Sequence, residues 1–260
     1  MRLSKHFQLP LFLALTINFT QIHAETAWDI VGIYPGMSPG EAEAQAKKIW
    51  PGIRLRPLEK GLTYSDGFQL RATEPTTVIM TGTSPKLPKE NVGLTFTPGT
   101  MPPRLVSVSR EVQPQNPPSI DQLQSALIEK YGQPYHRIES PGRGGNFPPS
   151  VRLFWAEPDK PRCDSNGYND DPQAITASYA IEALANFRNL QSKGLAPEDL
   201  SHCGKQVVAW LKGNPVTTLN VQLTDTGRWL NGLERAESLI KNLEIEATKE
   251  RESSAKNPVL

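Results

Sequence analysis

The sequence has no excess of charge of one sign and no long hydrophobic run beyond its N-terminus. Its 260 residues include 28 Lys and Arg against 27 Asp and Glu, so binding to nucleic acid through phosphate neutralisation is not expected. The one strongly apolar run is shorter than the roughly 20 residues that a membrane-spanning helix needs. Hydrophobic residues still make up 37% of the chain and recur periodically, which excludes a wholly disordered protein.

The N-terminal apolar run has the layout of a secretory signal peptide. Two basic residues precede an apolar stretch over residues 9–19, and Ala24 is the small residue that signal peptidases favour. We predict that residues 1–24 are cleaved, which leaves a periplasmic or secreted protein with no membrane span. A buried helix or a membrane anchor is the alternative. Because residue 25 is Glu25 and not cysteine, a lipoprotein anchor is not expected.

Cysteine is rare, and the chain contains only Cys163 and Cys203. An even pair in an exported chain predicts one disulfide. A loop of this length would stabilise the fold by about 4 kcal/mol in the chain-entropy description. Two alternatives are a reactive thiol beside His202 and a pair of structural cysteines that do not bond.

Histidine is scarce as well, because signal cleavage would leave only His136 and His202. The chain matches Gly-x-Ser-x-Gly at residues 36–40 and Ser-x-x-Lys at residues 238–241 and 253–256, but two histidines alone do not indicate a nucleophilic triad. A zinc site needs three or four ligands, which two scattered histidines do not supply. We therefore predict no catalytic residue, no metal and no cofactor. Paired carboxylates are the one enzymatic arrangement that the composition allows.

Two loops are candidates for binding. The segment 141–150, PGRGGNFPPS, carries Arg143 and Phe147, and both residue types are common at protein interfaces. The loop that begins at Asp164 has oxygen-bearing side chains at alternating positions, which suits calcium, but its glycine and last ligand position do not match an EF-hand. A polar turn beside the disulfide is the alternative. The weak calcium candidates are Asp164, Asn166 and Asp170.

Two helices have strong N-terminal signals. Ser38 and Glu41 form a Ser-x-x-Glu pattern, and Ser119 and Gln122 form a Ser-x-x-Gln pattern, both typical of a capping box. Each helix ends in an aromatic residue that glycine and proline follow closely. Two further helices are predicted over residues 177–192 and 228–243.

Short runs with alternating or β-branched character predict strands, so the expected fold class is α+β, with Ser-capped helices packed on antiparallel sheets. Asp66-Gly67 lies between two such runs and predicts a hairpin. The charged, Ser-rich chain after residue 246 is expected to be disordered. The predicted strands are residues 28–34, 53–58, 62–64, 68–72, 76–81, 92–96, 105–112, 135–138, 151–155, 207–211 and 217–223.

A capped helix followed by several strands occurs twice, which suggests two similar modules, although capped helices are common enough to occur twice by chance. The proline-rich segment 114–118 is the candidate boundary. The expected division is a signal peptide over 1–24, a first α+β module over 25–113, a second α+β module with the disulfide over 114–246, and a disordered tail over 247–260.

The segment 32–42, which contains Gly36-Met37-Ser38, resembles a helix start in small exported bacterial modules. These are the small lipoprotein subunit of the β-barrel assembly machine and the repeats of β-lactamase inhibitor proteins, and other exported proteins of Gram-negative bacteria have similar segments. In both, a strand runs into Gly-Met/Thr-Ser/Thr and then into a helix over an antiparallel sheet. The resemblance implies an α+β protein-binding scaffold without catalytic residues.

We therefore expect an exported, non-enzymatic binding protein of the periplasm or envelope. Its role would be that of an inhibitor, an immunity-type protein or an assembly accessory, and its partner would be a protein or an envelope component. The alternative is a hydrolase that cleaves envelope polysaccharide with paired carboxylates.

Overall fold

The computed structural model describes residues 28–99, 102–142, 148–163, 183–194 and 198–254. Its helices are α1 (Pro39–Ile49), α2 (Ile120–Tyr131), α3 (Ala183–Ser192) and α4 (Thr226–Ser254), with a short 3-10 turn η1 (Leu200–His202). Its strands are β1 (Arg56–Lys60), β2 (Thr63–Ser65), β3 (Leu70–Ala72), β4 (Thr76–Thr83), β5 (Lys89–Phe96), β6 (Leu105–Gln113), β7 (His136–Ser140), β8 (Ser150–Ala156), β9 (Lys205–Lys212) and β10 (Thr218–Asp225). The predicted signal peptide lies outside the described residues. In the part that is described, no helix combines the length and the apolar character that crossing a membrane requires.

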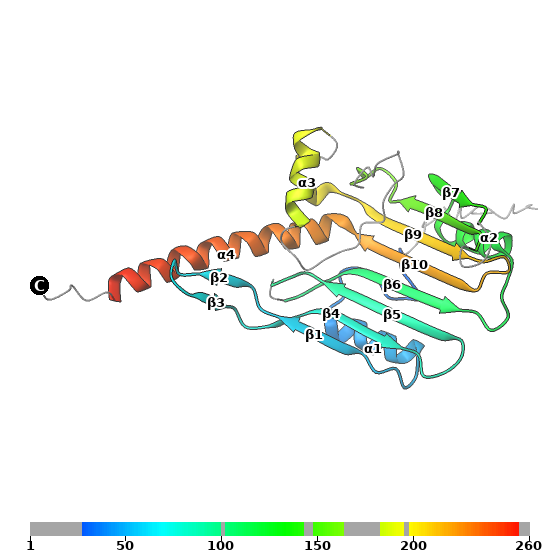
Figure 1. Ribbon diagram of the computed structural model, residues 1–260, viewed down its shortest axis with the longest axis horizontal. Coiled ribbons are helices and arrows are strands. Elements are labelled where there is room, and N and C mark those ends of the chain that lie inside the picture. Colours follow the sequence, from blue (N-terminus) through cyan, green and yellow to red (C-terminus); the bar gives the residue numbers. More distant parts are fainter. Residues whose placement is uncertain (1–27, 100–101, 143–147, 164–182, 195–197, 255–260) are drawn as a thin grey trace, which may run out of the picture.

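Eight of the strands form one antiparallel sheet with the order β1-β4-β5-β6-β10-β9-β8-β7, and β2 pairs with β3 in a separate hairpin (Figure 1). The α+β class is therefore confirmed. The hairpin turns at Asp66, whose Oδ1 accepts hydrogen bonds from the backbone N–H groups of Phe68 and Gln69, as the Asp66-Gly67 pair predicts.

The same arrangement occurs twice along the chain. One helix is followed by four strands of the sheet in each half, α1 by β1, β4, β5 and β6, and α2 by β7, β8, β9 and β10. The last strand of each half lies at the centre of the sheet, where Val108 of β6 pairs with Leu223 of β10. The segment 114–118 lies between β6 and α2, yet the two halves share one continuous sheet and one hydrophobic core.

Both capping boxes are present. The Ser38 hydroxyl accepts from the backbone N–H of Glu41, and the Glu41 carboxylate accepts from the backbone N–H of Ser38. Ser119 and Gln122 make the same reciprocal pair at the start of α2. Side chains thus satisfy backbone donors that have no partner inside the helix, which fixes where each helix begins.

The two capped helices pack against the same face of the sheet. Ala42 and Ala46 of α1 and Leu127 of α2 join one buried cluster with inward-facing strand residues such as Leu94 and Leu153. The alanines allow close approach of α1, and burial of the whole cluster supplies the main driving force for this layer.

A buried polar network ties α1 to this face. The indole N–H of Trp50, which follows α1, donates to Glu90 on β5 over 2.9 Å, and the same carboxylate pairs with Arg110 on β6 at 2.7 Å. Because Glu90 is buried, the charge needs both partners to offset its desolvation.

The predicted strand over residues 28–34 is wrong. Ile30 and Ile33 exchange backbone hydrogen bonds across a tight turn, and the two residues between them have positive φ, 49° at Val31 and 81° at Gly32. The side chain of Asp29 accepts from the Gly32 N–H over 2.7 Å and holds this turn. The β-branched residues that suggested a strand instead insert into the core, where Ile33 is completely buried.

The expectation of a disordered tail is wrong for residues 247–254, because α4 continues to Ser254, whereas residues 255–260 lie outside the described residues. Its second half projects beyond the sheet as an arm, and the β2–β3 hairpin lies alongside it (Figure 1). The backbone N–H of Ser65 donates to Glu244, Arg71 pairs with Glu250 at 3.3 Å, and Ala247 is buried. Contacts from a hairpin far away in sequence thus stabilise a charged helix that composition alone assigns to solvent.

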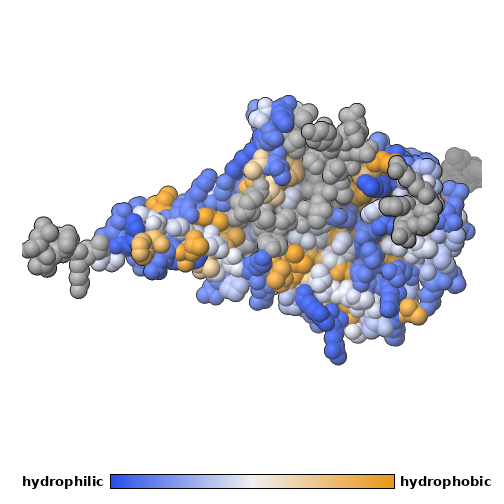
Figure 2. Space-filling view, in the orientation of Figure 1, coloured by the Kyte–Doolittle hydropathy of each residue, from blue (hydrophilic) through white to orange (hydrophobic). Residues whose placement is uncertain are grey.

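The arm formed by α4 and the hairpin exposes apolar side chains among charged ones (Figure 2). On the hairpin, Phe68 is 80% exposed and Leu70 is 78% exposed, and Ile245 on α4 is 53% exposed.

A second, smaller core lies around the first turns of α4, between the arm and the sheet (Figure 1). Trp229, Leu230 and Leu233 from the first turns of α4 pack with Leu184 and Phe187 of α3. The Cys163–Cys203 disulfide belongs to the same cluster and joins the chain after β8 to the start of β9.

Candidate functional site

The predicted interaction loop and calcium candidates lie outside the described residues. These are Arg143, Phe147, Asp164, Asn166 and Asp170. Within the described ranges, no group of three or more His, Cys, Asp or Glu side chains is arranged to hold a metal ion.

The cysteines form the predicted disulfide, with Cα atoms 5.6 Å apart. A reactive thiol beside His202 is therefore excluded, because Cys203 has no free sulfhydryl. His202 is exposed, and its Nε2 lies 3.4 Å from Asp199. His136 lies on β7 and packs on Phe154, with ring centroids 5.8 Å apart. The two histidines thus occupy separate surroundings, and neither adjoins a nucleophile identified by the sequence.

The sheet face opposite α1 and α2 is polar, and its residues form rows across the strands. One row crosses seven strands, and each member directly opposes the next. In order from β4 to β7 it consists of Thr83, Asn91, Glu111, Asn220, Trp210, Arg152 and Ile138. We call this side of the sheet the polar face.

Side chains along this row contact one another. Thr83 donates to the Asn91 amide oxygen over 2.9 Å, and the Asn91 amide donates to Glu111 over 3.2 Å. Their side chains line a depression of about 790 Å³ together with Arg54, Arg56 and other residues of β4 to β6 and β10. The depression therefore offers hydrogen-bonding groups and positive charge on a surface built from rigid strands.

Further along the row, two cations flank an indole. The Arg152 guanidinium lies 4.9 Å from the Trp210 ring centroid, and the Lys212 ammonium lies 3.6 Å from it. Cation–π attraction holds these side chains in a fixed cluster. Tryptophan and arginine are the residue types that most often dominate the energy of protein interfaces.

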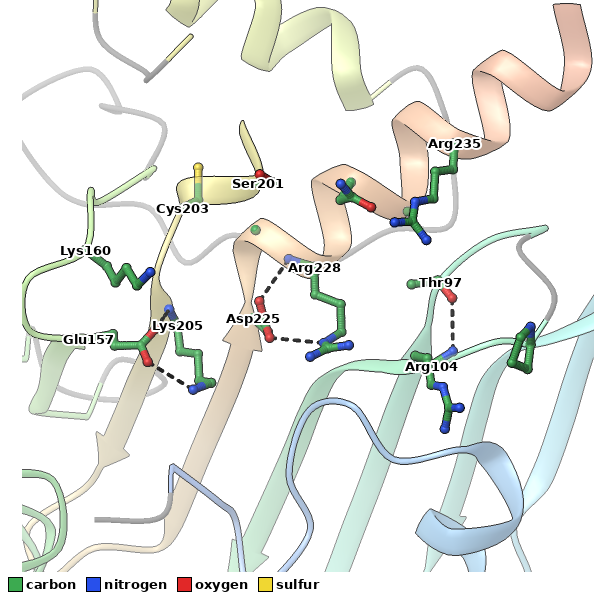
Figure 3. Close-up of a pocket in the computed structure, with 14 residues that line it drawn as sticks. Thr97, Arg104, Glu157, Lys160, Ser201, Cys203, Lys205, Asp225, Arg228 and Arg235 are labelled. Carbon is green, nitrogen blue, oxygen red and sulfur yellow. Dashed lines mark hydrogen bonds and ion pairs between the residues drawn. The ribbon is translucent and has the colours of Figure 1, made fainter. Parts of the chain in front are cut away.

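A second hollow, of about 670 Å³, lies where β10 passes into α4 (Figure 3). Its charged lining residues come from the loop before β6, the chain after β8, the start of β9 and the first turns of α4. They are Arg104, Lys160, Lys205, Arg228, Arg235, Glu157 and Asp225. We call this hollow the basic pocket, because five of these seven side chains are cationic.

Each carboxylate of the basic pocket is bound to one cation. Glu157 accepts from the backbone N–H and from the ammonium of Lys205, both over 3.0 Å. Asp225 accepts from the backbone N–H of Arg228 over 2.9 Å and from its guanidinium over 3.2 Å (Figure 3). Burial acts to raise the pKa of Glu157, but the hydrogen bonds and charge of Lys205, with a contribution from Lys160, lower it overall.

Neither the polar face nor the basic pocket was identified from the sequence. The members of the row on β5, β6, β10, β9 and β8 are spread over more than a hundred positions, and only strand pairing brings them together. Alternation along the strands was the available signal, since every second residue must share a face, but the strand order had to be known to use it.

Comparisons with protein families, with curated proteins and with solved structures found no match for this chain.

Proposed function

We propose that this chain is an exported, non-enzymatic binding protein of the periplasm or envelope that recognises a protein partner through the polar face of its sheet. The observation that carries the proposal is the row of opposed side chains that crosses seven strands on the face opposite α1 and α2. The disulfide favours an oxidising compartment, in agreement with the predicted signal peptide.

The composition of the polar face favours recognition of a folded surface. It combines a Trp210 anchor between two cations with hydrogen-bonding residues such as Asn91 and Asn220. Interfaces typically surround a few aromatic and arginine anchors with polar groups that exclude water. Side chains on strands keep their positions better than side chains on loops, which lowers the entropy lost on binding.

The tandem arrangement supports the same function. Helices over an antiparallel sheet, with a capped Gly-Met-Ser start at Gly36-Met37-Ser38, are what the resemblance to exported protein-binding modules implies. Two such units joined edge to edge make a broader face than either alone. An inhibitor or assembly accessory would use that breadth.

The alternative, a polysaccharide hydrolase with paired carboxylates, receives less support. Glu157 and Asp225 share the basic pocket, but each is bound to its own cation. A general acid in glycoside hydrolysis needs a carboxyl with a raised pKa, whereas the pKa of Glu157 is lowered. This pair therefore lacks the electrostatics that the reaction demands.

The test compares two charge-matched double variants of the mature protein. Thr81→Arg with Asn91→Arg places two cations on the exposed part of the polar face, and Ser125→Arg with Ala126→Arg places two on exposed α2 positions. Each variant is used as bait in an envelope extract, and retained proteins are quantified. We expect a partner that wild type and the α2 variant retain equally and that the polar-face variant loses by at least about tenfold.

Circular dichroism and thermal unfolding establish that both variants fold. Equal retention of every partner by the polar-face variant would refute this proposal, as would hydrolysis of purified envelope polysaccharide by wild type.

A further inference from the structure

We propose that the basic pocket binds a ligand that carries phosphate groups, independently of any partner on the polar face. The pocket lies at the end of the sheet, and none of its lining residues belongs to the depression on the polar face. The two sites can therefore be occupied together and disrupted separately.

The charge in the pocket exceeds what its own carboxylates neutralise. Lys205 and Arg228 are paired with Glu157 and Asp225. Arg104, Lys160 and Arg235 form no ion pair with these two carboxylates, although the charge of Lys160 also acts on Glu157. Among the described residues, the carboxylate that pairs with Arg104 is that of Glu41 on α1, at 4.0 Å.

Within the described part of the chain, no ion pair joins Lys160 or Arg235 to a carboxylate. Positively charged side chains around a hollow repel one another and raise the local concentration of anions. A bound anion of two or more charges would remove this repulsion.

Helix α4 presents one continuous stripe to the pocket. Arg228, Asn231, Gly232 and Arg235 follow the i, i+3, i+4, i+7 spacing of a single helix face, and all line the hollow. The stripe supplies two guanidinium groups and one amide. Because Gly232 has no side chain, Thr97 of the opposite wall can pack closely against the backbone of α4.

The pocket wall is rigid where α4 begins. A Cβ at Gly227 would lie 2.5 Å from the carbonyl oxygen of Cys203 and 2.6 Å from that of Ser201, so α4 packs directly on the backbone of η1. The disulfide at Cys203 fixes the same segment to the chain after β8, which carries Lys160. The backbone that carries Lys160, Lys205 and Arg228 is therefore fixed before a ligand arrives, so that binding orders only the cationic side chains.

Phosphate fits this donor set better than a single carboxylate. Arginine presents a planar fork that donates two parallel hydrogen bonds to phosphate oxygens, and lysine adds a compact charge. Three arginines and Lys160 can engage several phosphate oxygens at once. The volume of about 670 Å³ is enough for a phosphorylated sugar or a lipid headgroup, both of which present the same chemistry.

The test measures binding of three phosphate probes to the mature, oxidised protein at low salt. Pyrophosphate, glucose 6-phosphate and vesicles that contain phosphatidylglycerol are titrated by calorimetry or, for vesicles, by co-sedimentation, and citrate is titrated as the carboxylate control. Lys160→Gln with Arg235→Gln removes two unpaired cations from the pocket. Lys48→Gln with Lys249→Gln removes two exposed cations outside the pocket, so that the two double variants have the same net charge.

We expect at least one probe to bind wild type and the Lys48/Lys249 variant with the same affinity, and to bind the pocket variant at least about tenfold more weakly. Binding to vesicles alone would identify a lipid headgroup, and binding to a soluble probe would identify a free phosphate compound. No binding of any probe at millimolar concentration, tighter binding of citrate than of pyrophosphate, or equal weakening in both variants would overturn the proposal. Because the Thr81/Asn91 variant leaves the pocket intact, it should bind the probe normally even where it loses its protein partner.

Discussion

The two halves of the chain share one plan and differ in what interrupts it. In the first half the β2–β3 hairpin is inserted between β1 and β4. In the second half α3, η1 and the disulfide are inserted between β8 and β9. The shared plan builds the continuous sheet and its core, whereas the insertions build the features that only one half has.

The insertions differ in which feature of the molecule they build. The insertion in the second half supplies Glu157, Lys160 and Ser201 to the basic pocket, and the insertion in the first half supplies the hairpin that supports the arm of α4. The polar face, in contrast, uses strands of both halves. A repeated scaffold thus provides the broad surface, and its irregular parts provide the concave site.

The largest effect is expected from removing the disulfide, which only the second half has. Cys163→Ser with Cys203→Ser should lower the free energy of unfolding by about 4 kcal/mol, because the unfolded chain regains the freedom of a loop with a sequence separation of 40. Urea denaturation measures the loss, and wild type with reducing agent should match the double variant. Reducing agent added to the double variant is the control and should change nothing.

The next effect concerns the junction between the halves. Leu223→Ala removes a fully buried side chain opposite Val108 and should cost about 3 kcal/mol. Because the core is shared, hydrogen exchange should accelerate together in β5 and β9. Leu58→Ala on the edge strand β1, where the side chain is 41% exposed, is the control and should cost less than about 1 kcal/mol. Two separate unfolding transitions would show that the halves fold independently.

The smallest change in the free energy of unfolding is expected from removal of either capping box. Ser38→Ala and Ser119→Ala should each lower the free energy of unfolding by about 1 kcal/mol. The boxes differ in charge, because Glu41 closes the first and neutral Gln122 closes the second. The backbone N–H of Ser38, and next its hydroxyl, hold the pKa of Glu41 below its ordinary value of 4.5.

That difference predicts a pH dependence for the first box alone. A lowered pKa in the folded state means that the charged carboxylate contributes stability above pH 4.5, and that this stability is lost as pH falls through the folded-state pKa. The cost of Ser38→Ala should therefore decrease between pH 6 and pH 3, while the cost of Ser119→Ala stays constant. Thermal unfolding across this range measures both, and identical pH profiles would contradict the assignment of Glu41.

Local signals predicted most of the fold. The two capping boxes, the Asp66-Gly67 hairpin and the strands of the central sheet follow from short stretches whose hydrogen bonds or alternation act within a few residues. The predicted strand over residues 28–34 failed because burial in the core and a short-range side-chain hydrogen bond override the β propensity of its residues. Val31 and Ile33 have strand-like side chains, but burial of Ile33 and the Asp29 side chain favour a turn.

The candidate sites were less accessible to sequence reasoning. The disulfide was predicted because only two cysteines exist, so their pairing needs no spatial information. Arg104 and Arg235 are 131 positions apart and belong to different elements, and no motif marks either residue as part of a pocket. The net charge of the whole chain conceals the excess of positive charge in the basic pocket, because acidic residues elsewhere balance it.

Cap chemistry, hydrophobic periodicity and cysteine count fixed the helices, the strands and the covalent link of this protein, since each acts through neighbours in the chain or leaves a single choice. The order of the strands, the junction of β6 with β10, and the gathering of five cations around one hollow depend on which distant surfaces bury best against each other. That competition among long-range contacts is a property of the whole fold, because the free energy of burial depends on area removed from water and carries no record of sequence position.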